Sequence, residues 1–330
     1  MTSPTVSIVT PVYNGETFLE EAISSVLAQT FGDFEYVICD NHSKDASGAI
    51  AARYAQKDAR VRVINPPTFL PQAQNFNFAL QHISAHAKYC KMIFADDRLF
   101  PNCVAEMVAL AERAPNVGII SCYRLIETSP DGFGLRPERD VFTGREAARA
   151  HLLGDALAFG NPTQVMYRAD IVRERLPEFY SPRLLNFDMD VAYRILEKYD
   201  FGFVHQILCF ARYQKDAITP RLNGLNYWFL SRYMEVVDNG KQFLSDTEFA
   251  ACLERVRSEF YRELGKAWLK DRVRFKSPDE FWKFQAEQLQ TVGQTIEQRR
   301  LVRGVADAMF SYVGNLGAAF NTARYKVSPR

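Results

Sequence analysis

Short runs rich in valine, isoleucine and aromatic residues recur along the first two thirds of the chain. Between them lie segments whose apolar residues repeat every three or four positions, as they do on one face of a helix. Runs of this kind are typical of buried strands, and we expect strands at residues 5–10, 34–39, 61–64, 89–95, 117–123, 164–167 and 201–210. Strands that alternate with helices predict an α/β fold with a mainly parallel sheet flanked by helices.

The pattern changes beyond Thr219. From there to the end the sequence carries aromatic residues at helical spacing, Tyr227, Trp228 and Phe229 among them, and strand-like runs are absent. We therefore expect an α/β domain over residues 1–219 and a helical region over residues 220–330.

The last part of the helical region carries an apolar stripe between basic residues. The stripe consists of Val302, Val305, Met309, Val313, Leu316 and Phe320, and the basic residues are Arg299, Arg300, Arg303, Arg324, Lys326 and Arg330. A basic amphipathic helix can lie on an anionic membrane surface. Packing on the α/β domain or on a second copy explains the same stripe, and we favour packing. Asp307, Asn315 and Asn321 argue against a spanning helix.

Composition narrows the function classes. The 330 residues carry a net charge of +1, so nothing indicates a nucleic-acid partner. Six cysteines lack the spacing of a zinc site, and several lie in apolar runs, as buried thiols do. This use of cysteine fits a reducing cytoplasm. With no secretory signal and no long apolar segment in view, we expect a cytoplasmic protein, with peripheral membrane contact as an open alternative.

Two adjacent carboxylates, Asp96 and Asp97, follow the apolar run that ends at Ala95. Carboxylates at the end of a central strand are costly to bury without a cation, and open α/β sheets bind ligands just outside that end. Oxygen ligands suit Mg²⁺ or Mn²⁺, which commonly bind with a substrate diphosphate. We therefore hypothesise a metal–diphosphate site here, with an aspartate that caps the next helix as the alternative.

The first strand-to-helix turn disfavours two common nucleotide sites. It holds one glycine, Gly15, and the chain contains neither GxGxxG nor GxxxxGK[ST], which argues against an NAD enzyme and a P-loop NTPase. The first two strands end instead in Tyr13-Asn14 and Asp40-Asn41. An aromatic face beside an amide or carboxylate can bind a nucleobase by stacking and edge hydrogen bonds; for Tyr13, a packed core tyrosine is the alternative.

In this order, the segments resemble the family 2 glycosyltransferases, nucleotide-sugar enzymes with a GT-A fold, over about residues 5–215. The motifs that carry the resemblance are the first strand and turn at 6–15, a second signature at 29–45, an asparagine-bearing helix at 75–80, a metal motif at Asp96-Asp97 and a base segment at 186–194.

The resemblance implies an inverting transfer from a nucleotide-diphosphate sugar, a UDP-sugar first, to a hydroxyl of a saccharide or lipid-linked glycan, as in bacterial polysaccharide synthesis. It implies Mn²⁺ or Mg²⁺ on Asp97, supported by Asp96, and a catalytic base at Asp188, with Asp190 as its rival. The residues it implies in nucleotide binding are Pro11, Tyr13, Asn14, Asp40, Lys44, Asn75, Asp96 and Arg212. For Lys44 and Arg212, a surface ion pair is the alternative. Asn161 and Pro162 would line the acceptor side.

Two positions depart from the family pattern. Phe94 stands where the metal motif commonly begins with aspartate, and Phe187 stands where the base motif commonly has glutamate. These departures leave open a non-catalytic subunit that binds sugar nucleotides or serves as a scaffold in glycan assembly. A nucleotidyltransferase is a further alternative, disfavoured because its glycine-rich phosphate loop is missing.

Overall fold

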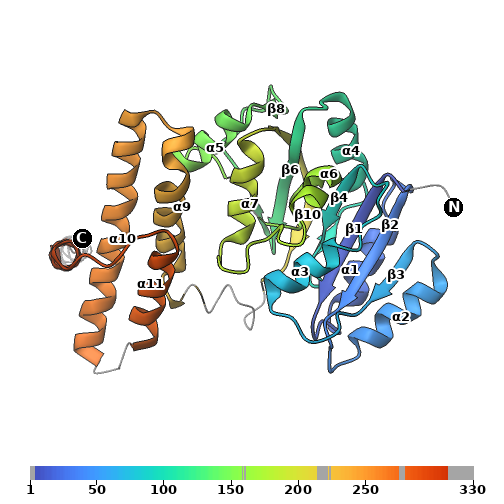
Figure 1. Ribbon diagram of the computed structural model, residues 1–330, viewed down its shortest axis with the longest axis horizontal. Coiled ribbons are helices and arrows are strands. Elements are labelled where there is room, and N and C mark those ends of the chain that lie inside the picture. Colours follow the sequence, from blue (N-terminus) through green and yellow to red (C-terminus); the bar gives the residue numbers. More distant parts are fainter. Residues whose placement is uncertain are drawn as a thin grey trace, which may run out of the picture. The chain divides into compact units, whose positions relative to one another are not determined.

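The computed structural model describes residues 4–157, 159, 161–213, 222, 224–274 and 279–310 (Figure 1). The chain divides into two compact units, residues 1–214 and 215–330. The first unit is α/β and the second is helical in its described residues.

In the described residues, the first unit contains one sheet of ten strands. The strands are β1 (Val6–Val12), β2 (Phe34–Asp40), β3 (Val61–Ile64), β4 (Tyr89–Met92), β5 (Arg98–Leu99), β6 (Val117–Ile126), β7 (Ser129–Asp131), β8 (Val141–Phe142), β9 (Met166–Arg168) and β10 (Asp200–Ala211). The order is β3-β2-β1-β4-β9-β6-β10-β5, with β7 beside β6 and β8 beside β10.

The principal strands of the sheet run in one direction. β1 pairs in parallel with both β2 and β4, β2 pairs in parallel with β3, and β6 pairs in parallel with β10. β9 lies antiparallel between β4 and β6. The carboxyl ends of β1, β2, β4 and β10 therefore lie along one edge of the sheet, and the prediction of a mixed, mainly parallel sheet is confirmed.

Helices cover both faces of this sheet (Figure 1). The helices of the first unit are α1 (Leu19–Leu27), α2 (Ser47–Lys57), α3 (Gln72–Leu80), α4 (Cys103–Arg113), α5 (Gly144–Leu153), α6 (Ala169–Arg175) and α7 (Phe187–Leu196). Apolar residues of α1, α2 and α4 join one core with Ile38 of β2. The next residue, Cys39, faces the other side and contacts α3, because successive strand residues alternate between faces.

Strand ends differ from the predictions where polar groups intervene. β4 stops at Met92, before the predicted end at 95, because the N–H of Asp97 bonds to the carbonyl of Phe94 and closes a turn. β6 continues beyond 123 to Ile126, where it pairs with β10 and β7. The turn after β4 is what brings the two carboxylates to the sheet edge.

The second unit consists of packed helices. α9 (Tyr227–Phe243) contacts α10 (Asp246–Arg274) and α11 (Asp279–Thr291), and residues 298–310 form a further helix. That helix crosses α10 closely, since a Cβ at Gly265 or Gly304 would overlap the backbone of the other helix. Among the described residues, none of the helices combines the length and apolarity needed to cross a bilayer.

Candidate functional site

The turns that follow β1 and β2 are joined by hydrogen bonds. Asn14 adopts a left-handed backbone with φ of +53°, its N–H donates to Ser43 Oγ (2.9 Å), and its Oδ1 accepts from the N–H of Lys44 (2.8 Å). Asparagine tolerates this backbone because its short amide bonds locally. Asn14 therefore fixes the spacing of the two turns, and Lys44 is exposed on the second.

An exposed pair of aromatic rings stands at the end of β1. Tyr13 is 44% exposed and meets Phe69, which is 55% exposed, edge to face with ring centroids 4.9 Å apart. The alternative of a packed core tyrosine is therefore wrong. Phe69 is missing from the sequence-based site, because one aromatic residue in a polar loop after β3 carries little signal. Together the rings offer an apolar surface of the kind on which a planar base stacks.

Asp40 is the last residue of β2 and pairs with Val12, the residue before Tyr13. It is buried, and its Oδ1 accepts a hydrogen bond from the N–H of Ser43 (3.1 Å). Gly48 leaves room for the carboxylate, since a Cβ there would lie 3.0 Å from Asp40 Oδ2. The carboxylate is thus held beside the Tyr13 turn, where the family resemblance expects a base-recognising group.

Pro11 and Asn75 lie deeper than the other predicted nucleotide contacts. Pro11 is buried in β1, paired with Cys39 of β2. Asn75 is buried on α3, and its Oδ1 accepts a hydrogen bond from Cys39 Sγ (3.3 Å). Pro11 is thus part of the end of β1, and Asn75 contacts the end of β2.

Asp96 and Asp97 form the electrostatic centre of the sheet edge. Asp97 is 4% exposed; its Oδ2 accepts from Thr163 Oγ1 (2.6 Å) and its Oδ1 from the N–H of Arg212 (3.1 Å). Burial first and neighbouring Asp96 second raise the pKa of Asp97 to about 7, and burial also raises the pKa of Asp96. The residue that directly precedes helix α4 is Asn102, five positions beyond Asp97, so the alternative that these aspartates cap a helix is wrong.

The donor set of this pair fits a divalent cation. Two adjacent carboxylates that disfavour each other's charge are stabilised when a cation lies between them. In the part of the chain that the structure describes, no three His, Cys, Asp or Glu side chains are grouped to hold an ion. Asp96 and Asp97 would therefore hold a metal only together with oxygen ligands from a diphosphate and water.

Arg212 is tied to the same edge. Its Nε donates to the carbonyl of Asp96 (3.2 Å), its Nη2 pairs with Glu21 (2.7 Å), and its guanidinium lies 4.1 Å above the ring of Phe18. The alternative of an ion pair is thus realised, yet the positive charge also stands directly beside the carboxylates.

The two candidate bases differ in their surroundings. Asp190 is buried on α7 and forms a double contact with Arg194, Nε to Oδ1 and Nη2 to Oδ2, both at 3.1 Å. Asp188, in the first turn of α7, is more exposed, and its Oδ1 accepts from the N–H of Met189 (2.9 Å). Residues two apart on a helix do not share a face, and the two carboxylates accordingly have different surroundings.

A family model for glycosyl transferase family 2 matches residues 7–176, which is more than half of the chain. The chain belongs to glycosyl transferase family 2.

Curated relatives agree over parts of their length. The chain is 31% identical to the putative glycosyltransferase EpsE of Bacillus subtilis over 137 residues, 41% of this chain and 48% of EpsE. It is 50% identical to the uncharacterized glycosyltransferase EpsJ of the same organism over 62 residues, 19% of this chain and 18% of EpsJ. The chain thus spans less than half of either relative.

Solved structures share the fold. The structure of Staphylococcus aureus TarS 1–349 in complex with UDP-GlcNAc aligns with a TM-score of 0.59 at 15% identity, over 93% of this chain and 89% of that one. The mannosyltransferase PcManGT of Pyrobaculum calidifontis, in complex with GDP-Man and Mn²⁺, aligns with a TM-score of 0.56 at 14% identity, over 93% and 88%. At these identities the likeness establishes the GT-A type of fold.

The two departures from the family 2 pattern meet in one aromatic cluster. The ring of Phe76, on α3, lies 5.4 Å from Phe94 and 5.8 Å from Phe187, and Tyr180 lies 5.2 Å from Phe187. The backbone of Tyr180 is held by Asn77, whose Nδ2 donates to its carbonyl (2.7 Å) and whose Oδ1 accepts from its N–H (2.8 Å). Both phenylalanines therefore pack against Phe76, one from the turn after β4 and the other from the start of α7.

The loop expected on the acceptor side lies against the metal motif. Asn161 Oδ1 accepts from the N–H of Thr163 (2.8 Å), and Pro162 and Thr163 are buried. Gly160, which precedes them, lies outside the described residues. Sequence reasoning stopped at Pro162 and missed Thr163, the residue that contacts Asp97.

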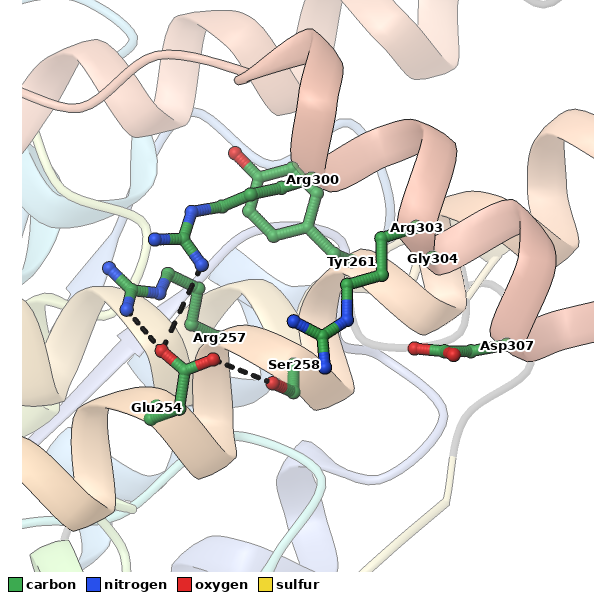
Figure 2. A pocket seen from close by; sticks show the side chains of 8 residues that line it. All are labelled: Glu254, Arg257, Ser258, Tyr261, Arg300, Arg303, Gly304 and Asp307. Carbon is green, nitrogen blue, oxygen red and sulfur yellow. Dashed lines mark hydrogen bonds and ion pairs between the residues drawn. The ribbon is translucent and has the colours of Figure 1, made fainter.

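A polar hollow lies in the helical unit, between α10 and the helix at 298–310 (Figure 2). Its charges are already paired: Glu254 bonds to Arg257 and lies 3.8 Å from Arg300, and Arg300 also pairs with Glu297 at 3.0 Å. Asp307 adds another carboxylate beside Arg303. Because its charges of opposite sign offset each other, this hollow is not a strong site for a diphosphate.

Proposed function

We propose that the chain transfers a sugar from a nucleotide-diphosphate sugar, a UDP-sugar first, to a hydroxyl of a saccharide or lipid-linked glycan. The observation that carries this proposal is the pair formed by the buried Asp97 and the half-buried Asp96, on the same sheet edge as Tyr13 and Asp40. Family membership supports it, and so do the nucleotide-sugar complexes of TarS and PcManGT.

The donor would lie across the ends of β1, β2 and β4. Tyr13 and Phe69 would stack on the base, and Asp40 would accept hydrogen bonds from its edge. Asn14 and Lys44 would contact the nucleotide from the turns after β1 and β2. Pro11 and Asn75 would complete the nucleotide-binding residues at the ends of these strands. The guanidinium of Arg212 would leave Glu21 and contact the phosphates instead.

Asp97, with Asp96, would hold Mn²⁺ or Mg²⁺. When bound, the ion supplies charge that stabilises the diphosphate as it leaves. Asp97 has one hydrogen bond on each oxygen, which keeps its carboxylate in a fixed orientation toward the edge.

Asp188 would act as the base. Its carboxylate would take the proton of the acceptor hydroxyl while the hydroxyl oxygen attacks the anomeric carbon from the face opposite the diphosphate. The bond to the diphosphate oxygen breaks in the same step, so the configuration inverts and no sugar–enzyme bond forms. Asn161 and Pro162 would border the acceptor.

Product analysis tests this mechanism. With an α-linked donor and an acceptor that supports release of the nucleotide diphosphate, the anomeric proton of the product in NMR should show the β configuration. An α-linked product would overturn inversion, and release of no nucleotide with any donor and acceptor would favour the non-catalytic alternative.

We further propose that the helical unit contacts an anionic membrane surface through its last described helix. Gly304 and Ala308 are buried, whereas Val302, Met309 and Phe310 are exposed, and Arg299 and Arg303 are also exposed. Apolar residues that face outward beside arginines are the pattern of a helix that binds an anionic membrane surface. Packing, which the sequence analysis favours, is the alternative. The rest of the stripe, from Val313 onward, lies outside the described residues.

Liposome flotation tests this contact. Full-length protein should float with vesicles that contain anionic lipid, and replacement of Val302, Met309 and Phe310 by serine should abolish flotation. Equal flotation of both proteins would exclude this surface, and a change of oligomeric state in the triple variant would instead indicate contact between copies of the chain.

A further inference from the structure

The hydroxyl of Thr163 joins both ends of the turn that carries the metal motif. Thr163 Oγ1 donates to Asp97 Oδ2 (2.6 Å) and accepts from the N–H of Phe94 (3.1 Å). The turn is also closed by its own backbone bond, from the N–H of Asp97 to the carbonyl of Phe94 (3.2 Å). One side chain from a segment remote in sequence therefore fixes both the turn and its carboxylate.

Thr163 is itself held on its backbone side. Its N–H donates to Asn161 Oδ1 (2.8 Å), and its carbonyl accepts from the ammonium of Lys91. Lys91 is fully buried on β4, and its Nζ also donates to the carbonyl of Val165 (3.2 Å). A buried lysine is costly unless its protons are bound, so these carbonyl contacts anchor the 161–165 segment against β4 firmly.

This anchoring matters for the direction of the Asp97 carboxylate. A carboxylate can rotate about its terminal torsion with little resistance, but here each oxygen already has a donor, Thr163 on one side and the N–H of Arg212 on the other. Groups that orient a metal-binding carboxylate commonly determine its affinity for the ion.

We propose that Thr163 is a positioning residue that orients Asp97 for the divalent cation of the sheet edge. The inference rests on the proposed function, since it concerns the same metal–diphosphate site. Thr163 does not contact the sugar or the ion in this role; it acts through Asp97.

Three substitutions separate the hydroxyl from the shape of the side chain. Thr163→Val keeps the branched shape and removes both hydrogen bonds of the hydroxyl. Thr163→Ser keeps the hydroxyl and removes a methyl group. Thr10→Val is the matched control, because Thr10 is equally buried and its hydroxyl bonds to Tyr36 (2.8 Å), away from Asp97.

Electron paramagnetic resonance measures the binding of Mn²⁺ to each variant in the presence of UDP. The thermal melting of each variant shows whether the variant is folded. Thr163→Val should bind Mn²⁺ about 10–100-fold more weakly than the unmodified protein. Thr163→Ser and Thr10→Val should bind it with nearly unchanged affinity.

Other outcomes overturn the inference. Unchanged Mn²⁺ affinity in a folded Thr163→Val protein would show that the hydroxyl does not position Asp97. Equal weakening in Thr163→Ser and Thr163→Val, or in Thr10→Val, would assign the effect to packing. If the unmodified protein binds no Mn²⁺ with any nucleotide diphosphate, the proposed function itself fails, and this inference fails with it.

Discussion

At the scale of single residues, the surroundings of Asp97 disfavour the charge of its carboxylate, and a bound cation would stabilise that charge. Its carboxylate is buried beside Asp96, and both burial and that neighbour oppose its ionisation. Perturbed carboxylates of this kind are concentrated at functional sites, because a fold has little reason to bury two like charges otherwise. The hydrogen-bond donors Thr163 and Arg212 hold the carboxylate in place, but the pKa of Asp97 stays raised.

Asp97→Asn should remove metal-dependent transfer, with a fall of at least about 100-fold in kcat/KM, an order of magnitude seen for lost electrostatic groups. The variant should stay folded. The raised pKa of Asp97 means that the folded protein binds a proton more tightly than the unfolded chain, so without metal the free energy of unfolding falls as pH rises from about 4 to about 7.

Denaturant titrations at several pH values, in chelator, give the control. The asparagine variant should lose that part of the pH dependence and gain stability above pH 7. Retention of full metal-dependent activity in Asp97→Asn would remove Asp97 from the metal site.

Asp188 and Asp190 should separate by their effects. Asp188→Asn should lower kcat by about 10²–10⁴, the usual range for a lost general base, with donor affinity unchanged. Asp190→Asn should lower the free energy of unfolding by about 1–3 kcal/mol, because its buried partner contact with Arg194 is weakened, and leave kcat of the folded protein largely intact. The opposite pattern in steady-state kinetics would make Asp190 the base.

Sequence reasoning located site residues that follow apolar runs and missed those that reach the site from elsewhere. Tyr13, Asp40 and Asp97 lie at or just after strand ends, where the sequence itself shows the change from apolar to polar residues. Phe69 and Thr163 lie in loops, and only the folded chain brings them to Tyr13 and Asp97. No local pattern encodes such contacts, because they depend on crossovers that join distant segments.

At the scale of elements, α5 (Gly144–Leu153) is a helix whose local signals are complete at both ends. α5 begins after Thr143, whose Oγ1 accepts from the N–H of Glu146 (3.2 Å), while Glu146 accepts from the N–H of Thr143 (2.8 Å). The helix ends at Gly154, which is left-handed with φ of +83°. A capping box at one end and a left-handed glycine at the other are signals that can be recognised in the sequence itself.

Elements defined by tertiary pairing were not predicted. β5 and β8 are two residues long and exist only because they pair with β10. The helix α6 is short and follows β9 directly. Segments this short contain too few residues to show a hydrophobic period. For β5 and β8, pairing with β10 determines the strand.

The capping box of α5 should contribute stability that acid removes. A hydrogen bond from Arg139 first, and the backbone of Thr143 second, lower the pKa of Glu146 from 4.5 to about 2. A depressed pKa means that the stabilisation is present above about pH 4.5 and is lost as pH falls toward 2. Glu146→Gln should therefore flatten the acid limb of the stability curve.

Urea titrations between pH 2 and pH 7 measure this effect. Thr143→Ala should cost about 1 kcal/mol at neutral pH through the lost cap, and Glu178→Gln, at an exposed position outside α5, should leave the acid limb unchanged. An acid limb in Glu146→Gln identical to that of the unmodified protein would show that the box is not formed in solution.

At the scale of the molecule, the parallel strands explain why one site collects residues from the whole first unit. β1, β2, β3, β4 and β10 end at one edge, so these strand ends and the segments that follow them supply Tyr13, Asp40, Phe69, the two carboxylates and Arg212 together. The alternation of strands and helices was enough to predict this convergence. It did not predict the aromatic cluster around Phe76, which stands where the family pattern has two carboxylates. The cluster depends on four segments that are separate in the sequence: α3, the turn after β4, the loop before α7, and α7 itself.

The most direct test of the account is a thermal-shift panel with UDP-, dTDP- and GDP-sugars, each with and without Mn²⁺, on the unmodified protein and on Asp97→Asn. Binding to the folded state stabilises it by about 2.7 kcal/mol at ligand concentrations about 100-fold above Kd. We predict a Mn²⁺-dependent rise of the melting temperature for one nucleotide base, absent in Asp97→Asn. No shift with any nucleotide, or an equal shift in both proteins, would contradict a metal–diphosphate site at Asp96-Asp97.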